Sequence, residues 1–141
     1  MLKKIDHIGI AVKDLEKAME IYQALSGRAA GHKETVEAQK VQTAFFPVGE
    51  VRLELLQGTA ADSPITKFIE KRGEGFHHIC FEVEDLDAAR NQLTARGFQF
   101  VAGISEQGAG GSKVAFIHPK STGGLLVELV EYPPASGGES V

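Results

Sequence analysis

Cysteine, tryptophan and long apolar runs are scarce or missing in this chain of 141 residues. Its single cysteine, Cys80, excludes an internal disulfide and a cysteine-rich zinc module. No apolar run approaches the roughly 20 residues that a membrane-spanning helix needs. The first residues also lack the apolar stretch of a signal peptide. We therefore expect a cytoplasmic protein without a membrane partner.

An excess of positive charge is also missing, since the net formal charge is −4 at pH 7. Nucleic acids are bound by basic surfaces, so we expect no nucleic-acid partner. The apolar share of 43% and the charged share of 24% are close to the averages of folded domains, which argues against disorder. At this length a domain buries enough surface to fold without a metal or a disulfide.

The chain does contain an internal repeat. Residues 7–18 align without gaps to residues 78–89, half a chain further on, and six of the twelve pairs are identical. The first identical pair is His7 with His78. Unrelated segments of this length share about one identity, so a duplication explains the match better than chance.

A second match extends the repeat. Residues 53–56 resemble residues 127–130, and this match pairs Glu54 with Glu128. Both glutamates stand inside short apolar runs of alternating pattern, which is typical of strands. Taken alone, such a glutamate is most often a solvated surface residue. Its recurrence in both halves instead favours a role inside a cleft.

The repeat predicts an α+β fold of two βαβββ modules. We expect modules at residues 1–57 and 76–132, a linker at 58–75 with a short helix over 64–71, and a flexible tail at 133–141. Two such modules would pair about a pseudo-two-fold axis, and their curled mixed sheet would enclose a metal cleft.

Local signals support these elements. Asp14 and Asp85 are expected to cap the helices that follow each first strand, and Gly27 and Gly97 to end them. A hairpin is predicted with its turn at Gly49.

The duplicated residues give four candidate metal ligands: His7, Glu54, His78 and Glu128. Equivalent positions of two related modules meet at the symmetry axis, which brings the four side chains together. Two imidazoles and two carboxylates suit a six-coordinate divalent transition metal with two further positions for water or substrate oxygens. We expect Co²⁺ as the bound cation in vitro, with Ni²⁺, Mn²⁺, Fe²⁺ and Zn²⁺ as alternatives.

Four segments carry a resemblance to a known family: residues 5–12, 51–56, 75–79 and, above all, 116–129, which read FIHPKSTGGLLVEL. With them the sequence resembles the vicinal oxygen chelate (glyoxalase and bleomycin-resistance) superfamily, and within it the methylmalonyl-CoA epimerases. The resemblance covers residues 3–132, and it places the family's metal ligands on the same four residues.

This resemblance implies an isomerase that interconverts (2R)- and (2S)-methylmalonyl-CoA. The proton at C2 would leave to give a metal-stabilised enolate and return on the other face, which requires two acid–base groups. Some members of the family have a separate catalytic glutamate, and its position corresponds to Thr43 here. We therefore expect Glu128 and Glu54 to act as the pair, each shifting between metal ligation and proton transfer.

The resemblance also suggests contacts with the acyl-CoA substrate by Lys113, Lys120 and Ser121. A homodimer is the usual assembly of the superfamily. Two alternatives remain, namely a glyoxalase I (lactoylglutathione lyase) type of isomerase and a non-catalytic member that binds a small molecule. The run from His118 to Gly124 favours the epimerase, and the complete ligand set argues against the binding protein.

Overall fold

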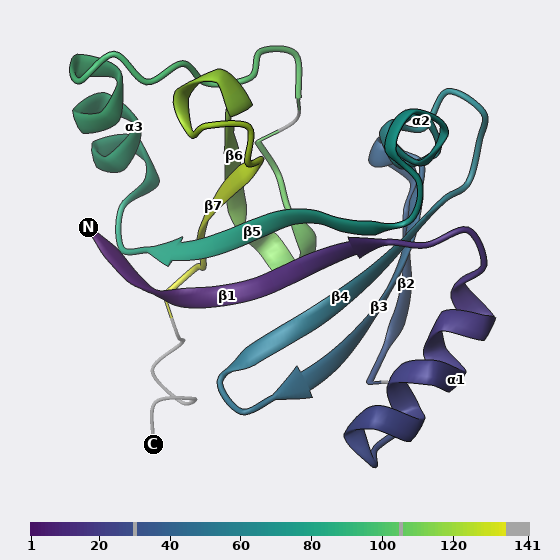
Figure 1. Ribbon diagram of the computed structural model, residues 1–141. Coiled ribbons are helices and arrows are strands. Elements are labelled where there is room, and N and C mark those ends of the chain that lie inside the picture. Colours follow the sequence, from purple (N-terminus) through teal and green to yellow (C-terminus); the bar gives the residue numbers. More distant parts are fainter. Residues whose placement is uncertain (30, 105, 135–141) are drawn as a thin grey trace. The chain divides into compact units, whose positions relative to one another are not determined.

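The computed structural model describes residues 1–29, 31–104 and 106–134 (Figure 1). Its helices and strands are β1 (Leu2–Ala11), α1 (Leu15–Ser26), β2 (Lys33–Val36), β3 (Val41–Val48), β4 (Val51–Gly58), α2 (Pro64–Arg72), β5 (Gly75–Val83), α3 (Leu86–Ala95), β6 (Lys113–Ile117) and β7 (Val127–Glu131). Short 3₁₀ turns occupy Glu37–Gln39, Ala109–Gly111 and Pro119–Ser121. From residue 135 onward, the predicted tail lies outside the described residues.

The sheet contains both parallel and antiparallel strand pairs. Strands β1 and β4 run parallel, whereas the pairs β2–β3, β3–β4 and β6–β7 are antiparallel. The α+β class with a mixed sheet is therefore confirmed. None of the helices in the described ranges is long and apolar enough to cross a membrane.

The helix ends follow the signals in the sequence. Helix α1 begins after Asp14, whose carboxylate accepts the backbone N–H of Lys17, and it ends at Gly27 with φ 73°. Helix α3 begins after Asp85 in the same way, and Gly97 follows its end with φ 93°. These caps satisfy backbone groups that a helix leaves open at its ends. The predicted linker helix is α2, and it extends one residue beyond the expected end.

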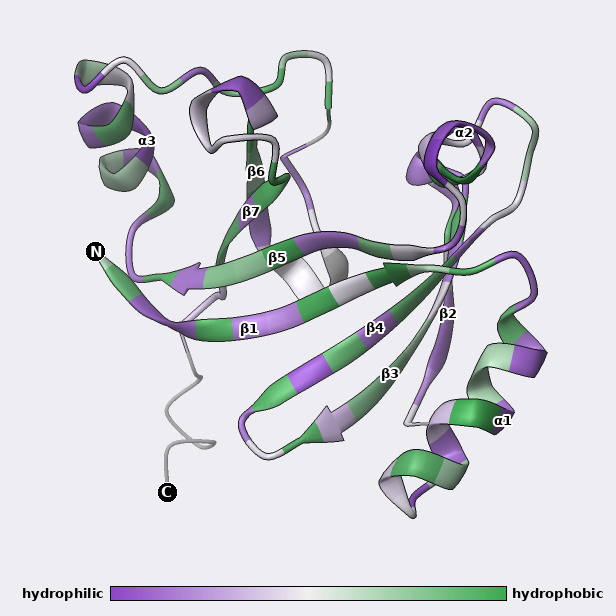
Figure 2. Cartoon of the chain, viewed as in Figure 1, coloured by the Kyte–Doolittle hydropathy of each residue, from purple (hydrophilic) through white to green (hydrophobic). Residues whose placement is uncertain are grey.

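Residues 5–80 form one compact unit, in which neighbouring strands follow the order β2-β3-β4-β1-β5. Figure 2 shows hydrophobic and hydrophilic residues alternating along β4. Because successive side chains of a strand point to opposite faces, Leu53 and Leu55 share one face of β4, and Arg52 and Glu54 share the other.

Two apolar clusters cover the two faces of this unit. The cluster below α1 contains Val12, Leu15, Ala18, Ala44, Phe46 and Leu55. The cluster below α2 contains Ala11, Val41, Leu56 and Ile65. Since the consecutive residues Leu55 and Leu56 belong to different clusters, α1 and α2 pack against opposite faces, and Glu54 shares its face with α2.

The second compact unit comprises residues 1–4 together with the described residues from 81 onward. Its strands follow the order β5-β7-β6, and α3 contacts both β6 and β7. Phe100 forms an isolated bridge with Ile117, where a further strand of the second predicted module would stand. The module boundaries at residues 57 and 76 stay a prediction.

Candidate metal centre

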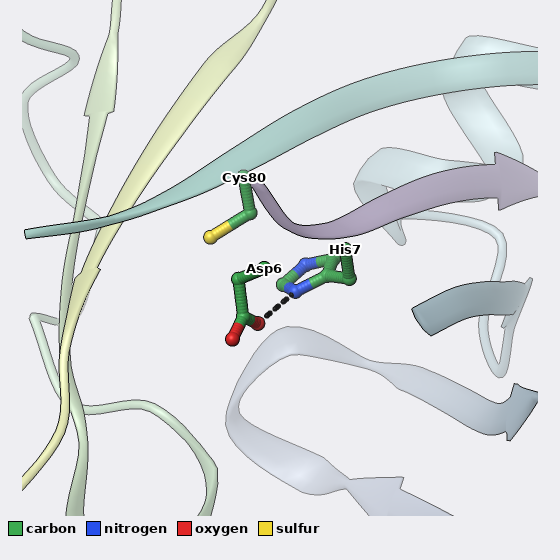
Figure 3. A group of neighbouring side chains, drawn as sticks. All are labelled: Asp6, His7 and Cys80. Carbon is green, nitrogen blue, oxygen red and sulfur yellow. Dashed lines mark hydrogen bonds and ion pairs between the residues drawn. The ribbon is translucent and has the colours of Figure 1, made fainter. Parts of the chain in front are cut away.

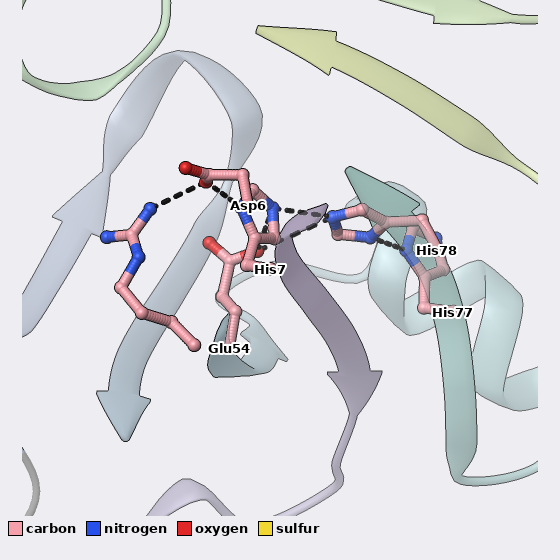
Figure 4. Close-up of polar contacts among 6 residues, drawn as sticks. Asp6, His7, Glu54, His77 and His78 are labelled. Carbon is pink, nitrogen blue, oxygen red and sulfur yellow. Dashed lines mark hydrogen bonds and ion pairs between the residues drawn. The ribbon is translucent and has the colours of Figure 1, made fainter. Parts of the chain in front are cut away.

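Three donor side chains converge from neighbouring strands of the unit 5–80. His7 comes from β1, Glu54 from β4 and His78 from β5 (Figure 4). The Nε2 atom of His7 lies 3.1 Å from His78 Nε2 and 3.3 Å from Glu54 Oε1. His78 Nε2 lies 3.5 Å from the same carboxylate oxygen. The side chains of the two histidines are 8% and 5% exposed, and that of Glu54 is 13% exposed.

These separations suit a common cation. At metal–ligand bonds of about 2.1 Å, two ligand atoms lie about 3.0 Å apart at a right angle and about 3.4 Å apart at the tetrahedral angle. The three observed separations fall around these values. Two imidazole nitrogens and one carboxylate oxygen are also the ligands that divalent transition metals prefer. The residues therefore fit a divalent metal ion, as the sequence predicts for these three positions.

The outer nitrogen of His7 is held by a carboxylate. His7 Nδ1 lies 2.7 Å from Asp6 Oδ2, and the same oxygen accepts a hydrogen bond of 2.7 Å from Arg52. The Arg52 guanidinium lies 4.4 Å from the centre of the Phe45 ring, which in turn meets the His7 ring nearly at a right angle. A hydrogen bond at Nδ1 fixes the tautomer that leaves Nε2 free of a proton, as a metal ligand requires.

His78 has a different support. Its Nδ1 lies 2.8 Å from Nδ1 of His77, so one of these two nitrogens carries the proton that they share. The His77 ring packs edge-on against Phe68 of α2, with ring centres 4.8 Å apart. His77 therefore lies behind the donor set, in contact with the outer edge of His78.

A glycine on β1 makes room for the His78 ring. A Cβ atom at Gly9 would lie 2.1 Å from His78 Cε1 and 2.3 Å from its Nδ1. Real side chains never approach so closely, so any residue other than glycine would displace the imidazole. Gly9 also pairs with Glu54 in the β1–β4 register, which places it in the middle of the donor set.

Cys80 occupies the position of the repeat that corresponds to Gly9. It is fully buried, and Figure 3 shows it beside Asp6 and His7. One ligand atom from each of these three residues lies within 4.8 Å of the others. The Oδ2 atom of Asp6 contacts both His7 Nδ1 and Arg52. The Asp6 carboxylate therefore supports His7 from outside the donor set.

The fourth predicted ligand, Glu128, belongs to the second compact unit. It lies within β7, opposite Phe116 of β6, and only 8% of its surface is exposed. The other residues of β7 from Val127 to Val130 are buried and apolar. Burial of a carboxylate in such surroundings is costly unless it is paired or binds a cation.

The predicted substrate contacts also lie in the second unit. Lys113 is the exposed first residue of β6. Lys120 is exposed on the turn Pro119–Ser121, and the hydroxyl of Ser121 accepts the backbone N–H of Gln99. A surface pocket of about 350 Å³ is lined by Arg96, Gly97, Phe98, Gln99, Lys120 and Ser121.

Thr43 lies on β3 and is buried, with 2% of its surface exposed. Its hydroxyl has no hydrogen-bond partner among the residues that the structure describes. It is two residues from Phe45, which pairs with Glu54, so Thr43 faces the same side of the sheet as the donor set. A hydroxyl at this position cannot act as a base at neutral pH.

Known proteins resemble this chain in sequence and in fold. Residues 6–116 match the family model described as the glyoxalase/bleomycin resistance protein/dioxygenase superfamily. The ethylmalonyl-CoA/methylmalonyl-CoA epimerase of Cereibacter sphaeroides is 39% identical over 131 residues, which cover 92% of this chain and 98% of the relative. The chain belongs to the methylmalonyl-CoA epimerase family of this superfamily.

Two further relatives show how widely the similarity extends. The uncharacterised protein YqjC of Bacillus subtilis is 45% identical over 130 residues, covering 92% of this chain and 93% of that protein. A solved structure of a Streptomyces coelicolor methylmalonyl-CoA epimerase variant, in complex with 2-nitronate-propionyl-CoA, has a TM-score of 0.88 and 37% identity. It covers 95% of this chain and 100% of that chain, so the resemblance stated from the sequence is confirmed.

Three residues around this donor set were not predicted from the sequence. Asp6 and Arg52 lie 46 residues apart, and only the parallel pairing of β1 with β4 brings Arg52 beside His7. Gly9 is the third. One signal for Gly9 was present, because the repeat places two small residues, Gly9 and Cys80, two positions after the two histidines.

Proposed function

We propose that this chain is a metal-dependent epimerase of methylmalonyl-CoA, which exchanges the proton at C2 between the two faces of that carbon. The single observation that carries the proposal is the convergence of His7, Glu54 and His78 on one point. The relatives with a named activity support the substrate, because they are epimerases of methylmalonyl-CoA. They favour this activity over the glyoxalase I alternative.

The metal would be held by His7, Glu54 and His78, with Glu128 as the proposed fourth ligand. A bound divalent cation supplies electrostatic stabilisation of the negative charge that develops on substrate oxygens when the C2 proton leaves. We expect Co²⁺ to serve best in vitro, with Ni²⁺, Mn²⁺, Fe²⁺ and Zn²⁺ as alternatives, since the mixed nitrogen and oxygen donors accept all of them.

Glu54 and Glu128 are the proposed acid–base pair. Inversion needs one group that removes the C2 proton and another that returns a proton to the opposite face. The Glu54 side chain is the most exposed of the three converging donors, at 13%, so it is the best placed of them to meet a substrate. Thr43 provides no carboxylate on the neighbouring strand. These observations support Glu54 as the group that removes the C2 proton.

The acyl-CoA substrate is proposed to contact Lys113, Lys120 and Ser121. Ammonium groups favour carboxylate and phosphate oxygens, both of which methylmalonyl-CoA contains. The exposed position of both lysines leaves them accessible to such a ligand. The homodimer and the cytoplasmic location belong to the same proposal, and both stay predictions.

The activity is tested by incubating the protein with methylmalonyl-CoA in deuterium oxide and following deuterium entry at C2. A parallel assay with the hemithioacetal of methylglyoxal and a thiol tests the glyoxalase alternative. We expect deuterium entry and no conversion of the hemithioacetal. The opposite pattern would reject the proposed function.

The Glu54→Gln substitution tests the acid–base role. An amide oxygen can still bind the metal but cannot carry the proton, so deuterium entry should fall by about 10²- to 10⁴-fold while the metal content stays the same. Glu16→Gln on α1 is the matched control and should leave both unchanged, since α1 packs on the opposite face of the sheet. Undiminished exchange in Glu54→Gln with metal bound would remove Glu54 from the proton transfer.

A further inference from the structure

Asp6 is a buried carboxylate that contacts both His7 and Arg52. Its Oδ2 atom lies 2.7 Å from His7 Nδ1 and 2.7 Å from an NH2 group of Arg52, while 6% of its side chain is exposed (Figure 4 shows Asp6 and His7). A buried carboxylate is stable only when its oxygens are paired, and here one oxygen serves both partners. Asp6 thus connects a proposed metal ligand to a guanidinium.

Arg52 is positioned by the sheet. In the parallel register of β1 and β4, Arg52 is the partner of His7, and it lies two residues before Glu54 on the same face of β4. The guanidinium stacks over the Phe45 ring at 4.4 Å, and that ring meets His7 at an angle of 82°. The four residues Asp6, Arg52, Phe45 and His7 therefore form a closed ring of contacts.

The geometry points to a role for this group of four residues. We propose that Asp6 and Arg52 are positioning residues for the metal ligand His7, an inference that rests on the proposed metal-dependent function. The Asp6 carboxylate accepts the Nδ1–H of His7, which keeps the proton away from Nε2 and fixes the plane of the ring. Arg52 donates a hydrogen bond to the same oxygen and so holds the carboxylate in place. The lone pair of Nε2 then points toward Glu54 and His78.

A similar group in the other unit consists of an arginine, a carboxylate and an aromatic ring, without a histidine. Arg90 donates to Glu106 at 2.8 Å and lies 4.9 Å from the centre of the Phe100 ring. The Glu106 side chain is 63% exposed, whereas that of Asp6 is almost fully buried. An exposed ion pair of this kind contributes little to the stability of the fold. Arg90→Gln is therefore a matched control for the loss of an arginine from a stacked ion pair.

The test measures Co²⁺ affinity by competition with a chelator and the visible absorption of bound Co²⁺. Asp6→Asn is close to isosteric, but its amide can turn an N–H toward His7 Nδ1 and so favour the tautomer with a proton on Nε2. We expect it to weaken Co²⁺ binding by about 10- to 100-fold. Arg52→Gln should weaken binding by about tenfold, and Arg52→Lys, which keeps one donor, should recover part of that loss.

Two further variants separate this proposal from the proposed function. His7→Ala should abolish Co²⁺ binding, and Arg90→Gln should bind like the unsubstituted protein. If His7→Ala binds normally, the metal site itself is rejected. If His7→Ala loses the metal while Asp6→Asn and Arg52→Gln keep full affinity and an unchanged spectrum, only the positioning role is overturned. Should Asp6→Asn fail to fold, the contrast between Arg52→Gln and Arg52→Lys decides.

Discussion

The substitution Gly9→Ala should remove the metal centre by steric displacement of one imidazole. The new methyl group would lie 2.1 Å from Cε1 and 2.3 Å from Nδ1 of His78. The φ angle at Gly9 is not in the positive range, so the backbone itself accepts alanine. The effect must therefore come from the clash with the ring.

The size of the effect follows from the distances. An ordinary contact between a methyl group and an aromatic carbon is about 3.4 Å or more, so the ring must move by roughly 1.3 Å. Ligand atoms of a metal site tolerate shifts of about 0.2 Å, so His78 would no longer reach the ion. Loss of a ligand should exceed the 10- to 100-fold effect typical of outer contacts. Overpacking should cost about 1–3 kcal/mol in stability.

Gly58→Ala is a close control. Its Cβ would lie 2.1 Å from the hydroxyl oxygen of Thr66 and 2.9 Å from that of Ser63, a clash of similar severity on the same strand as Glu54. Both variants should lower the urea midpoint of the metal-free protein, but only Gly9→Ala should lose Co²⁺ affinity in a chelator competition. Normal affinity in Gly9→Ala would refute the assigned contact between Gly9 and His78.

Two other predictions concern smaller changes. Cys80→Ala should keep Co²⁺ affinity within a few fold, as measured by titration. Cys80→Leu should overfill the space beside Asp6 and His7 and so weaken Co²⁺ binding. Urea unfolding should show that Cys80→Leu also lowers the free energy of unfolding by about 1–3 kcal/mol. The hydrogen bond from Lys40 holds the pKa of Asp62 below its ordinary value of 3.8. The pair therefore contributes to the stability of the fold at higher pH, and this contribution is lost as the pH falls through the lowered pKa. Carboxyl NMR titration should find that Lys40→Met raises the pKa of Asp62 toward its ordinary value, and an unchanged titration curve would contradict the assignment.

Much of the fold could be predicted because its signals are local. The aspartates before α1 and α3 and the glycines after them are recognised from single residues, since caps act within one turn of helix. The hairpin β3–β4 was predicted for the same reason, from its turn at Gly49. The short edge strand β2 had no such signal, because its sequence Lys-Glu-Thr-Val is largely polar.

The donor set was predictable from the repeat, and the family resemblance indicated the same residues. A single strand histidine or glutamate is ambiguous, but the coincidence of His7 with His78 singled out both imidazoles. The partners of these ligands could not be predicted, because Arg52 reaches Asp6 through strand pairing and not through sequence spacing. The placement of Glu128 as the fourth ligand stays a prediction.

The three converging donors stand on adjacent strands, β4, β1 and β5. Strand separation in a sheet is fixed by backbone hydrogen bonds at about 4.8 Å, so the gap available to an ion is set by the main chain and not by any loop. Insertions or exchanges in the connecting segments can therefore alter which molecule is accommodated while bond lengths at the ion stay constant. A scaffold of this kind keeps the geometry of its donor atoms separate from the choice of the bound molecule.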